Sequence, residues 1–287
     1  MKKITLILFL WLCTTITLSA QDNALLWKIE HETLSHPSYL YGTIHLICSE
    51  DMAEHPAVDW ALESVEKVVF ELDFSDLQLQ QKMMQAQVNS GDHIKNYLDE
   101  DHAEVLDEYF KQHIGAGLSQ IGNLKPFALT AMAMQSMIQC SEQLYSFEGA
   151  LLMKARELSL SVAGLETPEF QFGLFDSIPV EDQIDELVKG IMEPDSVINM
   201  FESMVHQYRE KNIESLYNTF TESPTGAYQK EILDDRNMAW IPKIEEMMEN
   251  DPIFIAVGAM HLAGKNGVIE LLRKQGYSVT PIRNDQP

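Results

Sequence analysis

Short apolar runs rich in β-branched and aromatic residues stand near both ends of this chain, and helical periodicity fills the long middle. "SYLYGTI" (38–44) and "KVVFELDF" (67–74) come early, whereas "PIFIAVGAMHL" (252–262) lies near the end of the 287 residues. Such runs, bounded by turn residues, are typical of strands. "PAVDWALESVEK" (56–67) separates the first two runs and has apolar residues at helical spacing. Strand, helix and strand in this order indicate parallel strands joined by a crossover helix.

The middle of the chain, from about 76 to 160, has helical periodicity and is rich in Met, Gln and Leu. "LSVAGLET" (160–167) then returns to a strand pattern. We therefore predict an α/β fold with a mixed, mainly parallel sheet built from both ends of the chain and a helical insertion in the middle. We interpret the methionines of the insertion as core residues, because methionine fills irregular gaps well.

The first twenty residues have the charged, apolar and small-residue regions of a secretory signal peptide. Their apolar stretch is short for a membrane-spanning helix, and an uncleaved anchor is the alternative. Bulky Leu12 argues against lipid anchoring at the adjacent Cys13. We expect residues 21–287 to form a single exported domain, periplasmic or secreted, with no stable membrane span after signal cleavage.

The chain carries 44 acidic against 20 basic residues, a net charge of −24. Such a charge repels nucleic acid and anionic membranes, which argues against both as partners. Two cysteines, Cys48 and Cys140, follow the predicted signal peptide. In an oxidising compartment they can form a disulfide, but separate burial as thiols is equally consistent with the sequence. The oligomeric state stays open.

Two of the predicted strands end in the same phrase, Gly-x-x-His followed by leucine, with Gly42 and His45 in one and Gly258 and His261 in the other. Ligands of open α/β sheets collect outside the carboxyl ends of the strands. If the two strands are neighbours, both imidazoles project into one cleft, and the glycines permit a sharp turn or a close approach. The alternative is that each histidine only caps its strand end by hydrogen bonding to the backbone.

Acidic residues occupy similar positions. Glu71 and Glu166 each end an apolar strand, where an unpartnered carboxylate is costly to bury. Arg236 follows in a late helical segment, where it could hold Glu166, bind a substrate carboxylate or form a surface pair. Two histidines and one or two carboxylates are a ligand set that activates water on a divalent ion. N-cap or salt-bridge roles are the alternative for the glutamates.

Six segments, in order along the chain, carry a family resemblance. They are "YLYGTIHLI", "PAVDWALESVEKVVFELDF", "LKPFALTAMAM", "GLETPEFQFGLFDSIPVEDQ", "DDRNMAWIPKIEEMM" and "IFIAVGAMHLAGKNGVIELLRKQGYSV". By these segments the chain resembles the TraB/GumN family, which includes the animal Tiki proteins and the bacterial pheromone-shutdown proteins. The resemblance covers nearly all of residues 25–283. It implies a fold like that of the erythromycin esterases.

The resemblance also implies the site. It matches the two Gly-x-x-His phrases to the family's two GxxH motifs, Glu71 to its strand-end glutamate, Glu166 to the glutamate of the GLET segment, and Arg236 to the arginine of the late helix. The Tiki branch is regarded as metal-dependent proteases that favour manganese or cobalt. The resemblance therefore implies a divalent ion, manganese or cobalt with zinc as an alternative, without naming the bond that is cut.

The leading hypothesis is an exported metal-dependent hydrolase acting on a peptide or another small-molecule substrate. His45, His261 and Glu71 would bind the metal. Glu166 would act as general base and Arg236 would stabilise the oxyanion. The alternative hypothesis is a non-catalytic binding protein that captures a peptide, haem or a metal in the same cleft.

Overall fold

The computed structural model describes residues 23–52, 56–88 and 93–283. Its main sheet has the strand order β6-β4-β7-β2-β1-β8. β6, β4, β7 and β2 run parallel, whereas β1 is antiparallel to both β2 and β8. The late strand β7 lies between the early strands β2 and β4, so the predicted sheet built from both ends of the chain is confirmed. The strands are β1 (Leu26–Glu30), β2 (Ser38–Thr43), β4 (Lys67–Leu72), β6 (Ser161–Glu166), β7 (Ile253–Gly258) and β8 (Ser278–Ile282).

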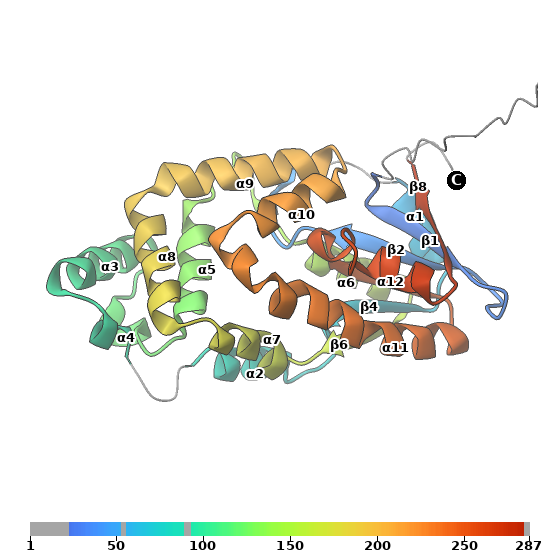
Figure 1. Ribbon diagram of the computed structural model, residues 1–287, viewed down its shortest axis with the longest axis horizontal. Helices are drawn as coiled ribbons and strands as arrows, with labels where there is room; N and C mark the ends of the chain where they lie inside the picture. Colours follow the sequence, from blue (N-terminus) through green and yellow to red (C-terminus); the bar gives the residue numbers. More distant parts are fainter. Residues whose placement is uncertain (1–22, 53–55, 89–92, 284–287) are drawn as a thin grey trace, which may run out of the picture.

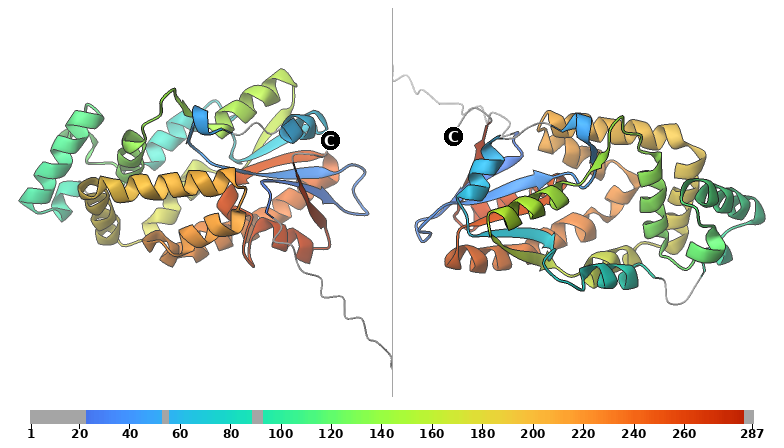
Figure 2. Two further views of the ribbon diagram at one scale, coloured as in Figure 1. Left: turned by 90° about the horizontal axis from the view of Figure 1, so that it is seen from above. Right: turned by 180° about the vertical axis from the view of Figure 1, so that it is seen from behind.

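Helices cover both faces of this sheet (Figures 1 and 2). α1 (Pro56–Glu63) and α6 (Phe147–Glu157) lie on one face, and α11 (Asp235–Asn250) and α12 (Val268–Lys274) lie on the other. The central strands are therefore buried on both sides. This explains why β4 and β7 are continuous apolar runs rather than alternating ones.

A group of helices lies beside the sheet and has its own hydrophobic cluster (Figure 1). The predicted insertion supplies α3 (Glu100–His113), α4 (Leu118–Ile121) and α5 (Pro126–Met137) to this group, whereas its α2 (Leu79–Ala86) lies outside the cluster and its α6 packs on the sheet. The group is nevertheless larger than predicted, because α8 (Val180–Met192) and α9 (Pro194–Arg209) follow β6 and pack against α5. Methionines of α5 do pack in this cluster, with Met137 buried and Met132 partly buried. The apolar faces of the insertion are thus covered by a later part of the chain.

Cys48 and Cys140 form a disulfide with their Cα atoms 5.3 Å apart, so the structure decides between the two alternatives that the sequence left open. Two short strands, β3 (Ile47–Cys48) and β5 (Leu144–Tyr145), pair antiparallel beside the disulfide. The turn that follows β2 is thereby fastened to the segment that precedes α6.

The predicted signal peptide, residues 1–20, lies outside the described residues. Within the part of the chain that the structure describes, no helix is both long and apolar enough to cross a membrane. The assignment of 21–287 to a single domain stays a prediction.

Candidate functional site

The residues singled out in the sequence meet at the carboxyl edge of the parallel strands. Thr43 ends β2 opposite Gly258, which ends the neighbouring β7, so the two Gly-x-x-His segments leave the sheet side by side. Glu71 is the second-last residue of β4 and Glu166 the last residue of β6. The predicted placement at one sheet edge follows directly from this topology.

The two motif glycines contribute differently. A Cβ on Gly42 would lie 3.0 Å from the Cα atom of Ala259, so only glycine lets these two segments approach so closely. Gly258 has room for a Cβ, since its nearest neighbour, Glu71 Oε1, would be 3.4 Å away. Its contribution is the backbone N–H, which donates to that Glu71 oxygen at 2.8 Å.

Arg236 lies at the centre of the site, with its side chain only 6% exposed. Nε and Nη2 donate to the two carboxylate oxygens of Glu166 at 2.8 Å, and Nη2 also donates to Glu71 Oε2 at 2.5 Å. Nη1 donates to the carbonyl oxygen of Ile232 and to His261 Nε2, each at 3.1 Å. A guanidinium has five N–H groups. All five are engaged here, four by Glu166, Glu71 and Ile232 and the fifth by His261.

Both glutamates are buried and extensively hydrogen-bonded. Gln171 Nε2 donates to Glu71 Oε2 at 2.9 Å, and Trp240 Nε1 donates to Glu166 Oε1 at 2.8 Å. Burial alone would raise the pKa of the Glu71 carboxyl, but the positive charge of Arg236 holds that pKa well below its usual range. Glu71 is therefore an anionic carboxylate at neutral pH.

His261 is held as a neutral imidazole by Asn237. The Asn237 amide donates through Nδ2 to the carbonyl oxygens of His261 and Asn266, so Oδ1 faces the ring and accepts from Nδ1–H at 2.6 Å. Nε2 then carries the lone pair, which accepts from Arg236 and lies 4.0 Å from Glu71 Oε1. Burial and the adjacent Arg236 lower the pKa of His261 to about 3.

His45 has a different environment, because its side chain is 68% exposed. Its Nδ1 bonds to Glu148 Oε1 at 2.9 Å, and Thr43 Oγ1 donates to the same oxygen at 2.8 Å. Partial burial of the ring lowers the pKa of His45. The hydrogen bond and the charge of Glu148 raise that pKa by more, so the net shift is upward. Because water reaches the ring, the shift is smaller than the same contact would produce in the interior.

The predicted metal ligands are only partly assembled. In the described ranges, no three His, Cys, Asp or Glu side chains are close enough together to hold a metal ion. The donor chemistry nevertheless suits a divalent ion, because Glu71 is ionised and His261 is neutral. His45 and His261 are both held through Nδ1, which leaves Nε2 as the ligand atom. An ion at His261 would replace the hydrogen bond from Arg236, and the metal site stays a prediction.

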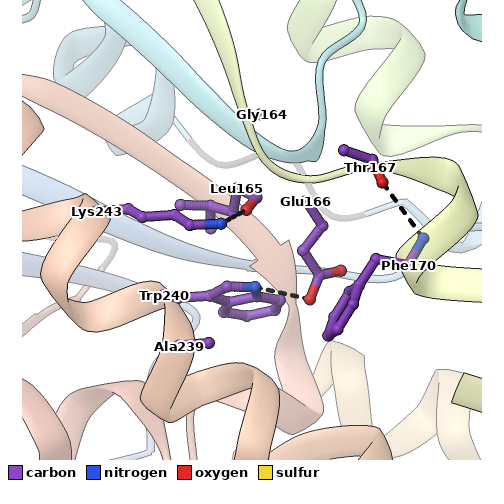
Figure 3. Close-up of a pocket in the computed structure, with 8 residues that line it drawn as sticks. All are labelled: Gly164, Leu165, Glu166, Thr167, Phe170, Ala239, Trp240 and Lys243. Atoms are coloured by element: carbon purple, nitrogen blue, oxygen red, sulfur yellow. Dashed lines mark hydrogen bonds between the residues drawn. The ribbon is translucent and has the colours of Figure 1, made fainter.

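A cavity of about 480 Å³ lies beside this network (Figure 3). Trp240 and Glu166 form part of its wall, and their hydrogen bond connects the cavity to the carboxylates. Lys243 lies at the same wall, where its Nζ donates to the carbonyl oxygen of Leu165 at 2.5 Å. The cavity is lined by Gly164, Leu165, Glu166, Thr167, Phe170, Ala239, Trp240 and Lys243.

The structure brings Glu71, Glu166, Arg236 and His261 into one hydrogen-bonded network, whereas His45 is bonded outside it. Sequence reasoning missed four residues that contact His45 or a member of this network. Asn237 and Trp240 follow Arg236 by one and four positions on α11, so their place beside it could have indicated them. Nothing in the sequence pointed to the other two. These are Gln171 of α7 (Pro168–Gly173) and Glu148, which is 103 residues from its partner His45.

Comparison with known proteins gives one match. The model of the TraB/PrgY/gumN family matches residues 25–281. No curated protein and no solved structure gives a significant match. The matched range spans nearly the whole chain and contains every residue of the site described above. The chain therefore belongs to the TraB/PrgY/gumN family.

Proposed function

We propose that this protein is an exported hydrolase of peptides that uses a divalent metal ion at the carboxyl edge of its sheet. The observation that carries the proposal is common to the two GxxH histidines. Each is held through Nδ1 by a polar side chain, His45 by Glu148 at 2.9 Å and His261 by Asn237 at 2.6 Å. Metal-binding histidines are held in this way, with the other ring nitrogen facing the ion.

His45, Glu71 and His261 would hold the ion, which we expect to be manganese or cobalt, with zinc as the alternative. A bound divalent ion supplies a water molecule that ionises near neutral pH and polarises the carbonyl under attack. The protein's own residues hold the ligand atoms in the required orientation and protonation state. Asn237 keeps the proton of His261 on Nδ1, and the N–H of Gly258 orients the Glu71 carboxylate.

We assign Glu166 and Arg236 to positioning, which differs from the base and oxyanion roles expected from the sequence. The Glu166 side chain is 2% exposed, and its carboxylate already accepts hydrogen bonds from both Arg236 and Trp240. Four of the five donors of Arg236 are engaged by Glu166, Glu71 and the carbonyl oxygen of Ile232, and only the one that faces His261 would be released by a bound ion. Together Glu166 and Arg236 fix Glu71 and set the charge around His261.

Three further features support the proposal. The cavity beside Glu166 provides space for a substrate side chain next to the network. The net charge of −24 favours neutral or basic peptides and disfavours nucleic acid as a substrate. The Cys48–Cys140 disulfide supports an oxidising location, periplasmic or extracellular, because such bonds persist mainly there.

Hydrolysis of an unstructured, fluorescently labelled peptide mixture by the purified protein tests this function. We expect EDTA to abolish the activity and manganese or cobalt to restore it, because the chain's own residues hold the ligand atoms but cannot replace the ion. His206→Ala should keep full activity, because His206 is an exposed histidine in the last turn of α9 and is not a member of the network around Arg236.

Full activity in EDTA would contradict the metal requirement. A protein that hydrolyses no peptide under any metal but gives a strong Soret band with added haemin would contradict hydrolysis and favour capture.

A further inference from the structure

We infer that Glu148 is the positioning residue for His45, and that the disulfide-linked β3–β5 pair holds it in place. This inference rests on the proposed function for its catalytic consequence, but the arrangement itself is independent of that function. Glu148 lies in the first turn of α6 on one face of the sheet, whereas the other site residues come from strand ends and α11.

The Glu148 carboxylate contacts the His45 ring through a single oxygen, Oε1. Its side chain is 11% exposed, and its Oε1 accepts from Thr43 Oγ1 at 2.8 Å as well as from His45 Nδ1 at 2.9 Å. Thr43 is itself 2% exposed and ends β2. The carboxylate is therefore fixed against the end of the strand, and the exposed imidazole is oriented by a group that cannot easily move.

The same two segments are fastened together next to the pair. Cys48 is three residues after His45, and its disulfide partner Cys140 precedes β5 and α6. The N–H of Ser49 donates to the carbonyl oxygen of Gln143 at 2.9 Å. The connection fixes the turn that carries His45 to the segment that leads into the helix of Glu148.

Chemically, Glu148 and Asn237 are counterparts with different charge. Each takes the Nδ1–H of one motif histidine and directs Nε2 away from itself. The buried ring of His261 has a neutral amide partner, whereas the exposed ring of His45 has a carboxylate. A carboxylate partner strengthens the imidazole as a ligand and opposes the competition of water for Nδ1.

NMR of the ¹⁵N-histidine-labelled protein, without added metal, tests the arrangement. The His45 signals are identified by their loss in His45→Gln. We expect Glu148→Gln to shift the ¹⁵N signal of His45 Nδ1 at fixed pH, because the carboxylate oxygen that accepts from Nδ1–H is replaced by an amide. Glu148→Asp keeps a carboxylate on a shorter side chain and should give an intermediate signal position. Glu157→Gln, an exposed position on the same helix, should leave the His45 signals unchanged.

Peptide hydrolysis by the same variants tests the catalytic consequence. Glu148→Gln should lower metal-dependent activity about 10- to 100-fold, the usual cost of losing a residue that orients a metal ligand. Glu148→Asp should recover part of it.

Reduction of the disulfide should broaden or shift the His45 ring signals.

Unchanged His45 signals in Glu148→Gln would overturn the inference, and so would full activity in that variant. If the wild-type protein hydrolyses nothing, the proposed function fails, while the NMR result still decides whether Glu148 holds His45.

Discussion

His45→Ala, His261→Ala and the double variant should each lose more than about 100-fold in metal-dependent peptide hydrolysis, and the double variant should lose little more than either single one. The two histidines would hold one ion, and a site that lacks one ligand no longer activates water. Residues that act as a single catalytic unit are strongly non-additive. Initial rates with manganese or cobalt at saturating concentration measure the effect.

The two single variants should differ in their free energy of unfolding. His261→Ala leaves Asn237 and Arg236 with unpaired buried groups, so it should lower the free energy of unfolding by about 1–3 kcal/mol. His45→Ala removes an exposed ring and should cost less than about 1 kcal/mol. If the loss of activity in the double variant equalled the product of the losses in the two single variants, the result would contradict a shared ion.

Arg236→Ala should have the largest effect on stability, lowering the free energy of unfolding by about 3–5 kcal/mol. Arg236 pairs with Glu71 at 2.5 Å and with Glu166 at 2.8 Å, and all three side chains are at most 8% exposed. Removing one partner of a buried ion pair leaves an uncompensated charge in the interior, which is strongly destabilising. Urea unfolding followed by circular dichroism measures the loss.

Arg209→Ala is the matched control, because Arg209 also forms an ion pair, with Asp51 at 3.0 Å, but is 52% exposed. Exposed pairs contribute about 0–1 kcal/mol. Arg236→Ala with a cost no greater than that of Arg209→Ala would show that Arg236 does not neutralise the two carboxylates.

The sheet and the position of the site were predictable from the sequence for a local reason. Strands buried on both faces need continuous apolar residues; β7 shows them over its whole length and β4 over residues 68–70. Glu71 and Glu166 stood out because a carboxylate at the end of such a run needs a partner. The parallel strand order then placed both at one edge of the sheet.

The bonding within the site was not predictable, because it depends on which helices approach the edge. For Arg236 the sequence offered three partners, Glu166, a substrate or a surface group; the structure shows Glu166 and adds Glu71, because the start of α11 brings Arg236 close enough for both glutamates to engage it. His45 was expected beside His261, but Glu148 from α6 binds its ring. The size of the helical group was underestimated for the same reason, since the packing of α8 against α5 joins segments separated by β6.

The most direct test of the central claim is anomalous diffraction at the cobalt edge from crystals of the protein grown with cobalt. We predict one strong peak at the carboxyl edge of the sheet, in contact with His45 Nε2, Glu71 and His261 Nε2, with Glu148 and Asn237 still on the Nδ1 atoms of the two rings. A crystal of the active protein with no peak at this edge, and with Arg236 still bonded to His261 Nε2, would contradict the shared metal site.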